Sequence, residues 1–90
     1  MKLALTETNS KLGDRTKFEI VVEAVLVDGN ILKFTETKVF DVDETFTPDA
    51  IDHVRRRAKR LQMWLLSNSD KPKEYFYEHL EERHAFQLVD

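Results

Sequence analysis

The sequence predicts an α+β domain of two layers, in which an antiparallel, hairpin-based sheet carries a long helix and a shorter second helix on one face. Three observations predict this fold. Alternating apolar residues surround an Asp28-Gly29 pair, apolar residues recur at helical spacing between residues 47 and 66, and a proline-led aromatic segment follows. A chain of 90 residues can bury one small core, so we expect a single domain over residues 1–90.

The N-terminal part of the chain contains the clearest strand pattern. Residues 1–5 alternate weakly and indicate a short strand, whereas residues 6–16 are polar and indicate a loop or a wide turn. From Lys17 onwards apolar and other residues alternate strictly, which is typical of a half-buried strand. The residues predicted to face the core are Phe18, Ile20, Val22, Ala24 and Leu26.

The Asp28-Gly29 pair predicts a hairpin turn, because glycine adopts the positive φ that such a turn requires. The return strand is expected over residues 31–42. A register that places Leu32 and Phe34 on the Val22 side buries the most apolar area, and a slip by one residue would turn that set outward. The other face keeps apolar residues, so we expect either that something else covers it or that it tends to associate with other apolar surfaces. These residues are Val21, Val25, Ile31 and Val39.

The segment from Thr47 to Leu66 predicts the long helix. Thr47 can cap its first backbone donors, Pro48 suits the first helical position, and acidic residues in the first turns favour the positive end of the helix dipole. One face is apolar at three- and four-residue steps and must pack on the sheet. Its residues are Ile51, Val54, Ala58, Leu61 and Leu65.

The C-terminal part predicts a second helix and a closing strand. Pro72 can open a helix that runs to Arg83, with Phe76 and Leu80 as its core contacts. The aromatic residues 75–77 are expected to cover the end of the first helix, where residues 63–66 are apolar nearly all round. Residues 85–89 alternate and indicate a short strand that closes the sheet.

Composition excludes several classes of site. The chain has no cysteine, which excludes disulfides, thiolate metal ligands and a cysteine nucleophile. Its three histidines, at positions 53, 79 and 84, fit no zinc-binding spacing, so no metal or cofactor is expected. No apolar run reaches the length that spans a bilayer, and the N-terminus becomes acidic too soon for a secretory signal. We therefore expect a cytoplasmic protein without a membrane partner.

Residues 39–45, Val-Phe-Asp-Val-Asp-Glu-Thr, resemble the first motif of the haloacid dehalogenase phosphatase superfamily, in which an apolar strand ends in Asp-x-Asp-x-Thr. The resemblance implies Asp41 as nucleophile, Asp43 as acid/base and Thr45 as its support, within a parallel Rossmann-like sheet. The motif covers 7 of 90 residues, and the pattern after Thr45 predicts two helices and one short strand. We expect a non-enzymatic protein. A phosphatase-like enzyme using Asp41 and Asp43 ranks third, after the two binding functions considered below.

Positive charge is concentrated in the long helix. Five of the 14 basic residues lie within six positions, and the other 9 stand against 17 acidic residues. On a helix, four side chains point away from the apolar stripe and two arginines flank it. The first set is Arg56, Lys59, Arg60 and Met63, and the flanking residues are Arg55 and Arg57.

Three interpretations of this cluster follow. It can be a docking surface for an acidic protein partner, contacted by Arg55, Arg56, Lys59, Arg60 and Met63, with the remaining apolar hairpin face offering a second contact or self-association. It can bind nucleic acid, although the sequence pI of about 5.6 argues against this. It can also be a solvated face whose arginines pair with acidic residues of the same chain. We favour a protein partner, or a second copy of the chain, with nucleic acid as the alternative.

Overall fold

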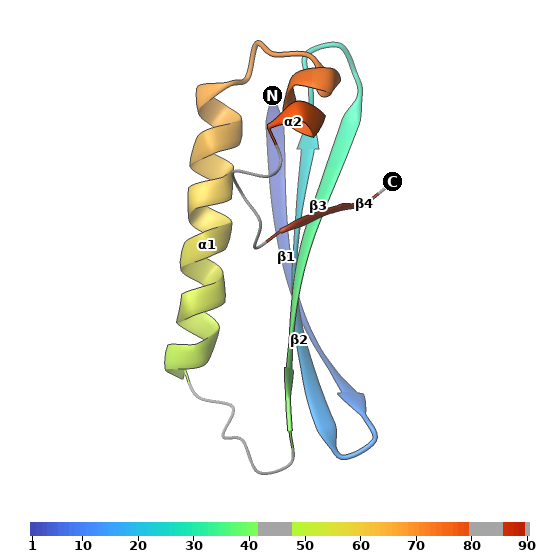
Figure 1. Cartoon of the computed structure of the whole chain (residues 1–90), viewed down its shortest axis with the longest axis vertical. Coiled ribbons are helices and arrows are strands. Elements are labelled where there is room, and N and C mark those ends of the chain that lie inside the picture. The colour runs from blue at the N-terminus through green and yellow to red at the C-terminus, as the bar shows by residue number, and fades with distance from the viewer. Residues whose placement is uncertain (42–47, 80–85, 90) are drawn as a thin grey trace.

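Four strands and two helices form two layers in a computed structural model of the protein (Figure 1). The structure describes residues 1–41, 48–79 and 86–89. The strands form one antiparallel sheet in the order β1-β2-β3-β4, which confirms the predicted α+β two-layer fold. The elements are β1 (Lys2–Leu12), β2 (Arg15–Val25), β3 (Ile31–Phe40), α1 (Pro48–Ser67), α2 (Lys73–Glu78) and β4 (Gln87–Val89).

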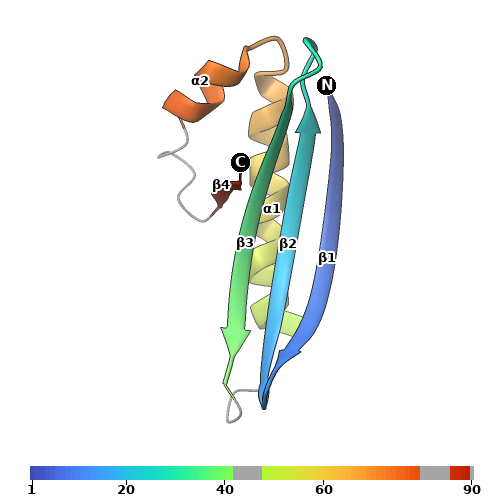
Figure 2. The same cartoon turned by 90° about the vertical axis from the view of Figure 1, so that its right-hand side faces the viewer.

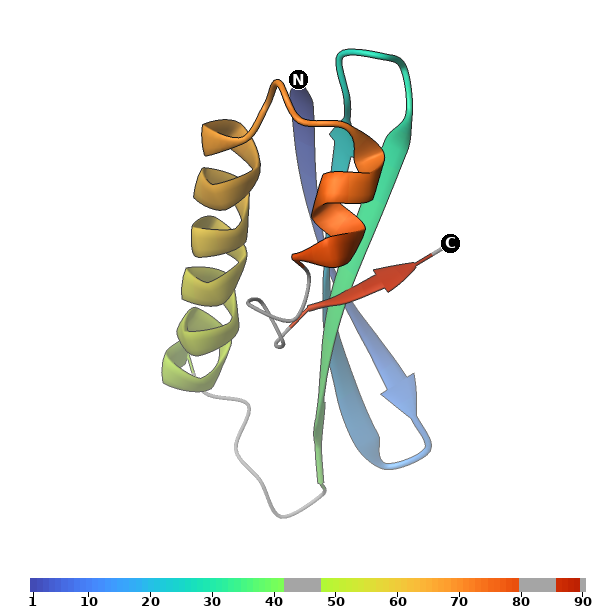
Figure 3. The ribbon, with the colours of Figure 1, turned by 45° about the horizontal axis from the view of Figure 1, so that its top comes forward.

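Helix α1 covers one face of the sheet, and neither of the two described helices lies on the opposite face (Figure 2). The short helix α2 lies on the β3 side, beside the end of α1, as the tilted view also shows (Figure 3). The molecule is elongated, with extents of 44 × 21 × 21 Å, because the β1–β2 and β2–β3 hairpins run along its whole length. Within the described residues, neither helix has the length and apolar character needed to cross a membrane.

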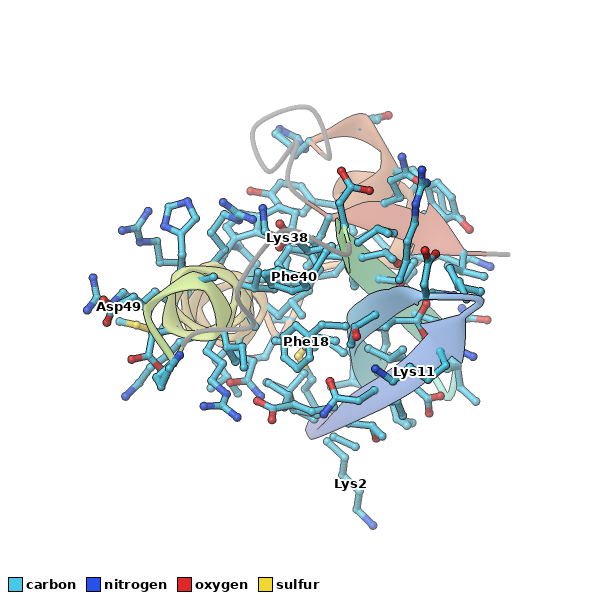
Figure 4. All side chains as sticks on the ribbon, turned by 90° about the horizontal axis from the view of Figure 1, so that it is seen from below. Lys2, Lys11, Phe18, Lys38, Phe40 and Asp49 are labelled. Carbon is cyan, nitrogen blue, oxygen red and sulfur yellow. The ribbon has the colours of Figure 1, made fainter. Side chains whose placement is uncertain are left out.

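The core lies between α1 and the sheet, as the strand pattern predicted. All five apolar residues predicted to face the core, at alternate positions from Phe18 to Leu26, are buried. Val22 pairs with Phe34 and Ala24 pairs with Leu32, so the predicted register is confirmed. Figure 4 shows Phe18 and Phe40 between the helix and the sheet. Val42, the last residue of the predicted return strand, lies outside the described residues.

The predicted turn at Asp28-Gly29 is present between β2 and β3. Leu26 and Asn30 face each other, with the Leu26 amide donating to the Asn30 carbonyl at 2.8 Å, and Gly29 has φ +89°. The Asp28 carboxylate accepts from the Asn30 backbone amide at 3.0 Å and from the Asn30 side chain at 2.8 Å. The left-handed glycine and the aspartate bridge together fix the turn, which is why this short signal is reliable in the sequence.

The strand expected over residues 1–5 is present, but the segment after it differs from the prediction. Residues 6–16 were expected to form a loop, but β1 runs from Lys2 to Leu12 and pairs with β2 without interruption as far as Leu12 opposite Arg15. Gly13 at φ +66° and Asp14, which has no positive φ, form the connecting turn, an arrangement typical of type II′. Strand β1 is an edge strand that is exposed at every residue except Leu3, so it needs no apolar alternation. Beyond Leu5 the alternation on which strand prediction depends is therefore absent.

The apolar stripe of α1 packs on the sheet as predicted. All five stripe residues are buried, and Trp64 joins them at 9% exposure. The Trp64 ring meets the ring of Phe76 on α2 edge to face, with centroids 5.5 Å apart, which links the end of α1 to α2. The predicted cap, Thr47, lies outside the described residues.

The C-terminal prediction is confirmed in part. Phe76 is fully buried, and β4 pairs with Lys33–Thr35 of β3, so the closing strand is present. Pro72 is the residue before α2 rather than its first helical residue, and α2 ends at Glu78. The predicted continuation to Arg83, with Leu80, and the predicted strand start at Ala85 lie outside the described residues. The aromatic cover is incomplete, since Met63 remains 62% and Leu66 54% exposed.

Candidate functional site

Two acidic residues share one cross-strand row on the helix-covered face of the sheet. Ile20 of β2 pairs with Glu7 of β1 on one side and with Glu36 of β3 on the other. Residues directly opposite each other in a sheet point to the same face. The row therefore presents carboxylates at its two ends and a fully buried apolar side chain in the middle.

Two arginines of α1 meet this row. Arg55 donates from Nε and a terminal nitrogen to the two carboxylate oxygens of Glu7, at 2.6 and 2.8 Å. Arg57 donates to both carboxylate oxygens of Glu36, with Nε to Oε2 at 3.2 Å. Both pairs are bidentate, the geometry in which guanidinium and carboxylate interact best. Two of the five clustered cations are thus committed to holding α1 on the sheet, one on each side of Ile20.

The Glu36 pair is more enclosed than the Glu7 pair. The Glu36 side chain is only 10% exposed and that of Arg57 is 29% exposed, against 31% for Glu7 and 49% for Arg55. Arg55 also lies 3.6 Å from Asp52, one turn earlier on α1. Solvent and salt screen an exposed pair, so the Arg57–Glu36 pair is expected to contribute more to stability than the Arg55–Glu7 pair.

Acidification is expected to weaken the Arg55–Glu7 pair. The hydrogen bonds from Arg55 lower the pKa of Glu7 from its ordinary value of 4.5. Because the unfolded chain then binds the proton more readily, the pair contributes stability above that value and loses it as pH falls through the lowered pKa. Urea unfolding midpoints should therefore fall more steeply between about pH 5 and 3 for the wild type than for Glu7→Gln. Arg55→Gln removes the group that lowers the pKa of Glu7 and should behave like Glu7→Gln. If both variants kept the pH dependence of the wild type, the contribution of the Arg55–Glu7 pair would be contradicted.

The remaining cations of the cluster lie on the outer face of α1. Arg56, Lys59 and Arg60 are exposed, and no ion pair joins them to another residue in the described ranges. With Met63 they occupy steps of three, four and seven residues, so they form one surface. We call Arg56, Lys59, Arg60 and Met63 the basic helix surface. It faces away from the sheet, since the buried stripe of α1 faces the opposite way.

The structure does not assemble the candidate catalytic and metal-binding residues into a site within the described ranges. Asp41 lies 3.1 Å from Arg15 in an exposed ion pair, while Asp43 and Thr45 lie outside the described residues. All strand pairs of the described sheet are antiparallel, so the parallel sheet that the phosphatase resemblance implies is not the fold found. His53 is exposed on α1, and His79 contacts the Tyr75 carbonyl at 2.7 Å through Nδ1. The described part of the chain places no three metal-binding side chains together.

Sequence reasoning found the cluster but did not separate its members. It placed Arg55 among the partner-contacting residues, whereas the structure places Arg55 in a bidentate pair with Glu7. Glu7 falls in the segment that was expected to be a loop, so no sequence signal placed it opposite α1. Comparison with protein-family models, with curated proteins and with solved structures finds no match to this chain.

Proposed function

We propose that the protein is a non-enzymatic binding protein whose basic helix surface docks on an acidic region of a protein partner. One observation carries this proposal. The cluster divides into two arginines that pair with the sheet and three cations that stay exposed and pair with no other described residue. Arginine offers bidentate contacts to carboxylates, and the exposed Met63 and Leu66 add apolar area beside the charges.

The apolar face of the hairpin is a weaker candidate for the same interface. Val25, Ile31 and Val39 remain 37%, 60% and 40% exposed on the sheet face that carries no helix. This face and the basic helix surface lie on opposite sides of the molecule, because α1 covers the other sheet face (Figure 2). One compact partner cannot contact both, so the proposal rests on α1. The absence of cysteine favours action in the cytoplasm.

Reversal of two charges on the basic helix surface is expected to weaken partner binding. Arg56→Glu/Arg60→Glu replaces attraction by repulsion at two neighbouring positions, and we expect affinity to fall by on the order of 10- to 100-fold. The measurement is affinity capture from native cell extract, at low and moderate salt, with identification of captured proteins. Lys33→Glu/Lys71→Glu changes net charge equally, on exposed residues outside α1 and β1, and serves as the matched control.

The outcomes separate the interpretations. An acidic protein captured by the wild type and by the control, but not by the α1 variant, supports the proposal. Captured material that disappears after nuclease treatment would instead identify nucleic acid as the partner, with strong salt dependence. Equal capture by all three proteins, or none by any, would contradict a partner site on this surface.

A further inference from the structure

Among the described residues, strand β1 forms a long edge of the sheet that pairs with β2 alone. The strand order places β1 at one end, while β4 and α2 lie on the β3 side (Figure 2). Its pairing with β2 is continuous over 11 residues, without a bulge and without proline. Natural proteins usually protect such edges by bulges, prolines, central charges or a covering segment. The charges of β1 are Lys2 and Lys11 near its ends and a central Glu7, whose carboxylate is drawn toward α1 by Arg55.

The turn geometry determines which backbone groups face outward. In a two-residue hairpin the closing pair, here Leu12 and Arg15, exchanges hydrogen bonds with each other. Pairing alternates along an antiparallel ladder, so the even-numbered residues of β1 bond to β2 and the odd-numbered ones offer their amide and carbonyl groups to the free edge. The outward groups belong to Leu3, Leu5, Glu7, Asn9 and Lys11. The middle of the edge can therefore accept another strand.

The side of α1 above this edge is basic. Arg55 contacts Glu7 of β1, which places this side of the helix over β1. Lys59, at the edge of the basic helix surface nearest Arg55, is one turn further along and is exposed without an ion pair to any described residue. A strand added beside β1 would direct every second side chain to the face that carries Leu5 and α1. Carboxylates at those positions would approach Lys59, and apolar atoms would cover Leu5, which is 40% exposed.

We infer that β1 binds an extended acidic segment of the partner as a fifth strand, an inference that rests on the proposed function and specifies how the partner is held. A second copy of this chain fits the edge less well in the register centred on Glu7. Two β1 strands paired about their centre would place the Glu7 residues directly opposite each other and Lys11 opposite Leu3, and like charges in that position destabilise a sheet. A carboxylate of an acidic strand placed opposite Glu7 meets the same charge, which Arg55 offsets through its pair with Glu7.

The test uses a capped peptide of alternating Val and Glu, of about ten residues, which is a usual strand length. The control peptide has Lys in place of Glu. Binding of the Glu peptide to the wild type should slow hydrogen exchange at the outward amides of Leu5, Glu7 and Asn9 by at least about tenfold, with little change at Thr6 and Thr8, which already bond to β2. This measurement needs no variant. Protection by both peptides alike, or by neither, would overturn the inference.

A variant that removes a backbone donor tests the added strand in a second way, through peptide affinity and extract binding. Leu5→Pro removes one outward amide and is tolerated on an edge strand, whereas Leu5→Ala trims the side chain and keeps the amide. We expect Leu5→Pro to weaken peptide affinity at least about tenfold and Leu5→Ala far less. Loss of extract binding in Arg56→Glu/Arg60→Glu but not in Leu5→Pro would leave the proposed function standing and reject the added strand. If the same amides were protected in the wild type without any peptide, and the protection rose with protein concentration, the edge would bind a second copy instead.

Discussion

Replacement of Phe34 by alanine is expected to lower the free energy of unfolding by about 3–5 kcal/mol. Phe34 is fully buried and lies in the centre of the sheet, opposite Val22 of β2 and Leu88 of β4. The substitution removes the ring and leaves a cavity that the paired strands cannot close without breaking their register. A domain of this size is stable by about 5–15 kcal/mol, so the variant should lose a large part of its stability.

Urea denaturation followed by circular dichroism measures this change, and Ile31→Ala is the matched control. Ile31 lies on the same strand but is 60% exposed on the sheet face that carries no helix. Its truncation should cost less than about 1 kcal/mol, because only strand propensity and partial burial are lost. Equal losses in the two variants would contradict this assignment of the β3 faces, and a larger loss in Ile31→Ala would reverse it.

The β2–β3 hairpin and α1 could be predicted because each has a strong local signal. Strict alternation from Phe18 to Leu26 leaves one register that buries the apolar set, and the Asp28-Gly29 turn fixes where the chain reverses. The apolar stripe of α1 is equally informative, since its spacing repeats over five buried positions. In these elements the local pattern and the tertiary contacts favour the same structure.

Beyond Leu5, strand β1 could not be predicted from alternation, because its side chains there have no apolar buried face to alternate with. Its stability comes from the backbone ladder with β2, and such a ladder leaves little trace in a sequence of Thr, Glu, Asn and Ser. One local signal was present. A Gly13-Asp14 pair fits a type II′ turn, which would have paired residues 2–12 with residues 15–25.

The division of the basic cluster could not be predicted for a related reason. Helical spacing places Arg55 and Arg57 beside the apolar stripe but does not show what they meet. Their partners, Glu7 and Glu36, are 48 and 21 residues away in the chain and come together only because both pair with Ile20. Long-range strand pairing thus decides which cations are neutralised and which remain available for a partner.

Truncation of Arg57 is expected to show that some arginines of the basic cluster stabilise the fold while others are available for binding. Arg57→Ala leaves the Glu36 carboxylate, which is 10% exposed, without its guanidinium, and an enclosed charge without a partner is costly. We expect the free energy of unfolding to fall by about 1–3 kcal/mol. Arg56→Ala, its neighbour on the outer face, should change stability by no more than about 0.5 kcal/mol. Urea denaturation of the two variants at neutral pH makes the comparison.

A double variant distinguishes loss of the pair from loss of helix packing. In Arg57→Met/Glu36→Leu no charge is left unpaired and apolar atoms fill the same space, so stability should return to within about 1 kcal/mol of the wild type or exceed it. The double variant keeps Arg56, Lys59, Arg60 and Met63, and partner capture should therefore be unchanged. If Arg57→Ala proved as stable as Arg56→Ala, or if the double variant lost its partner, the separation into pairing and docking arginines would be wrong.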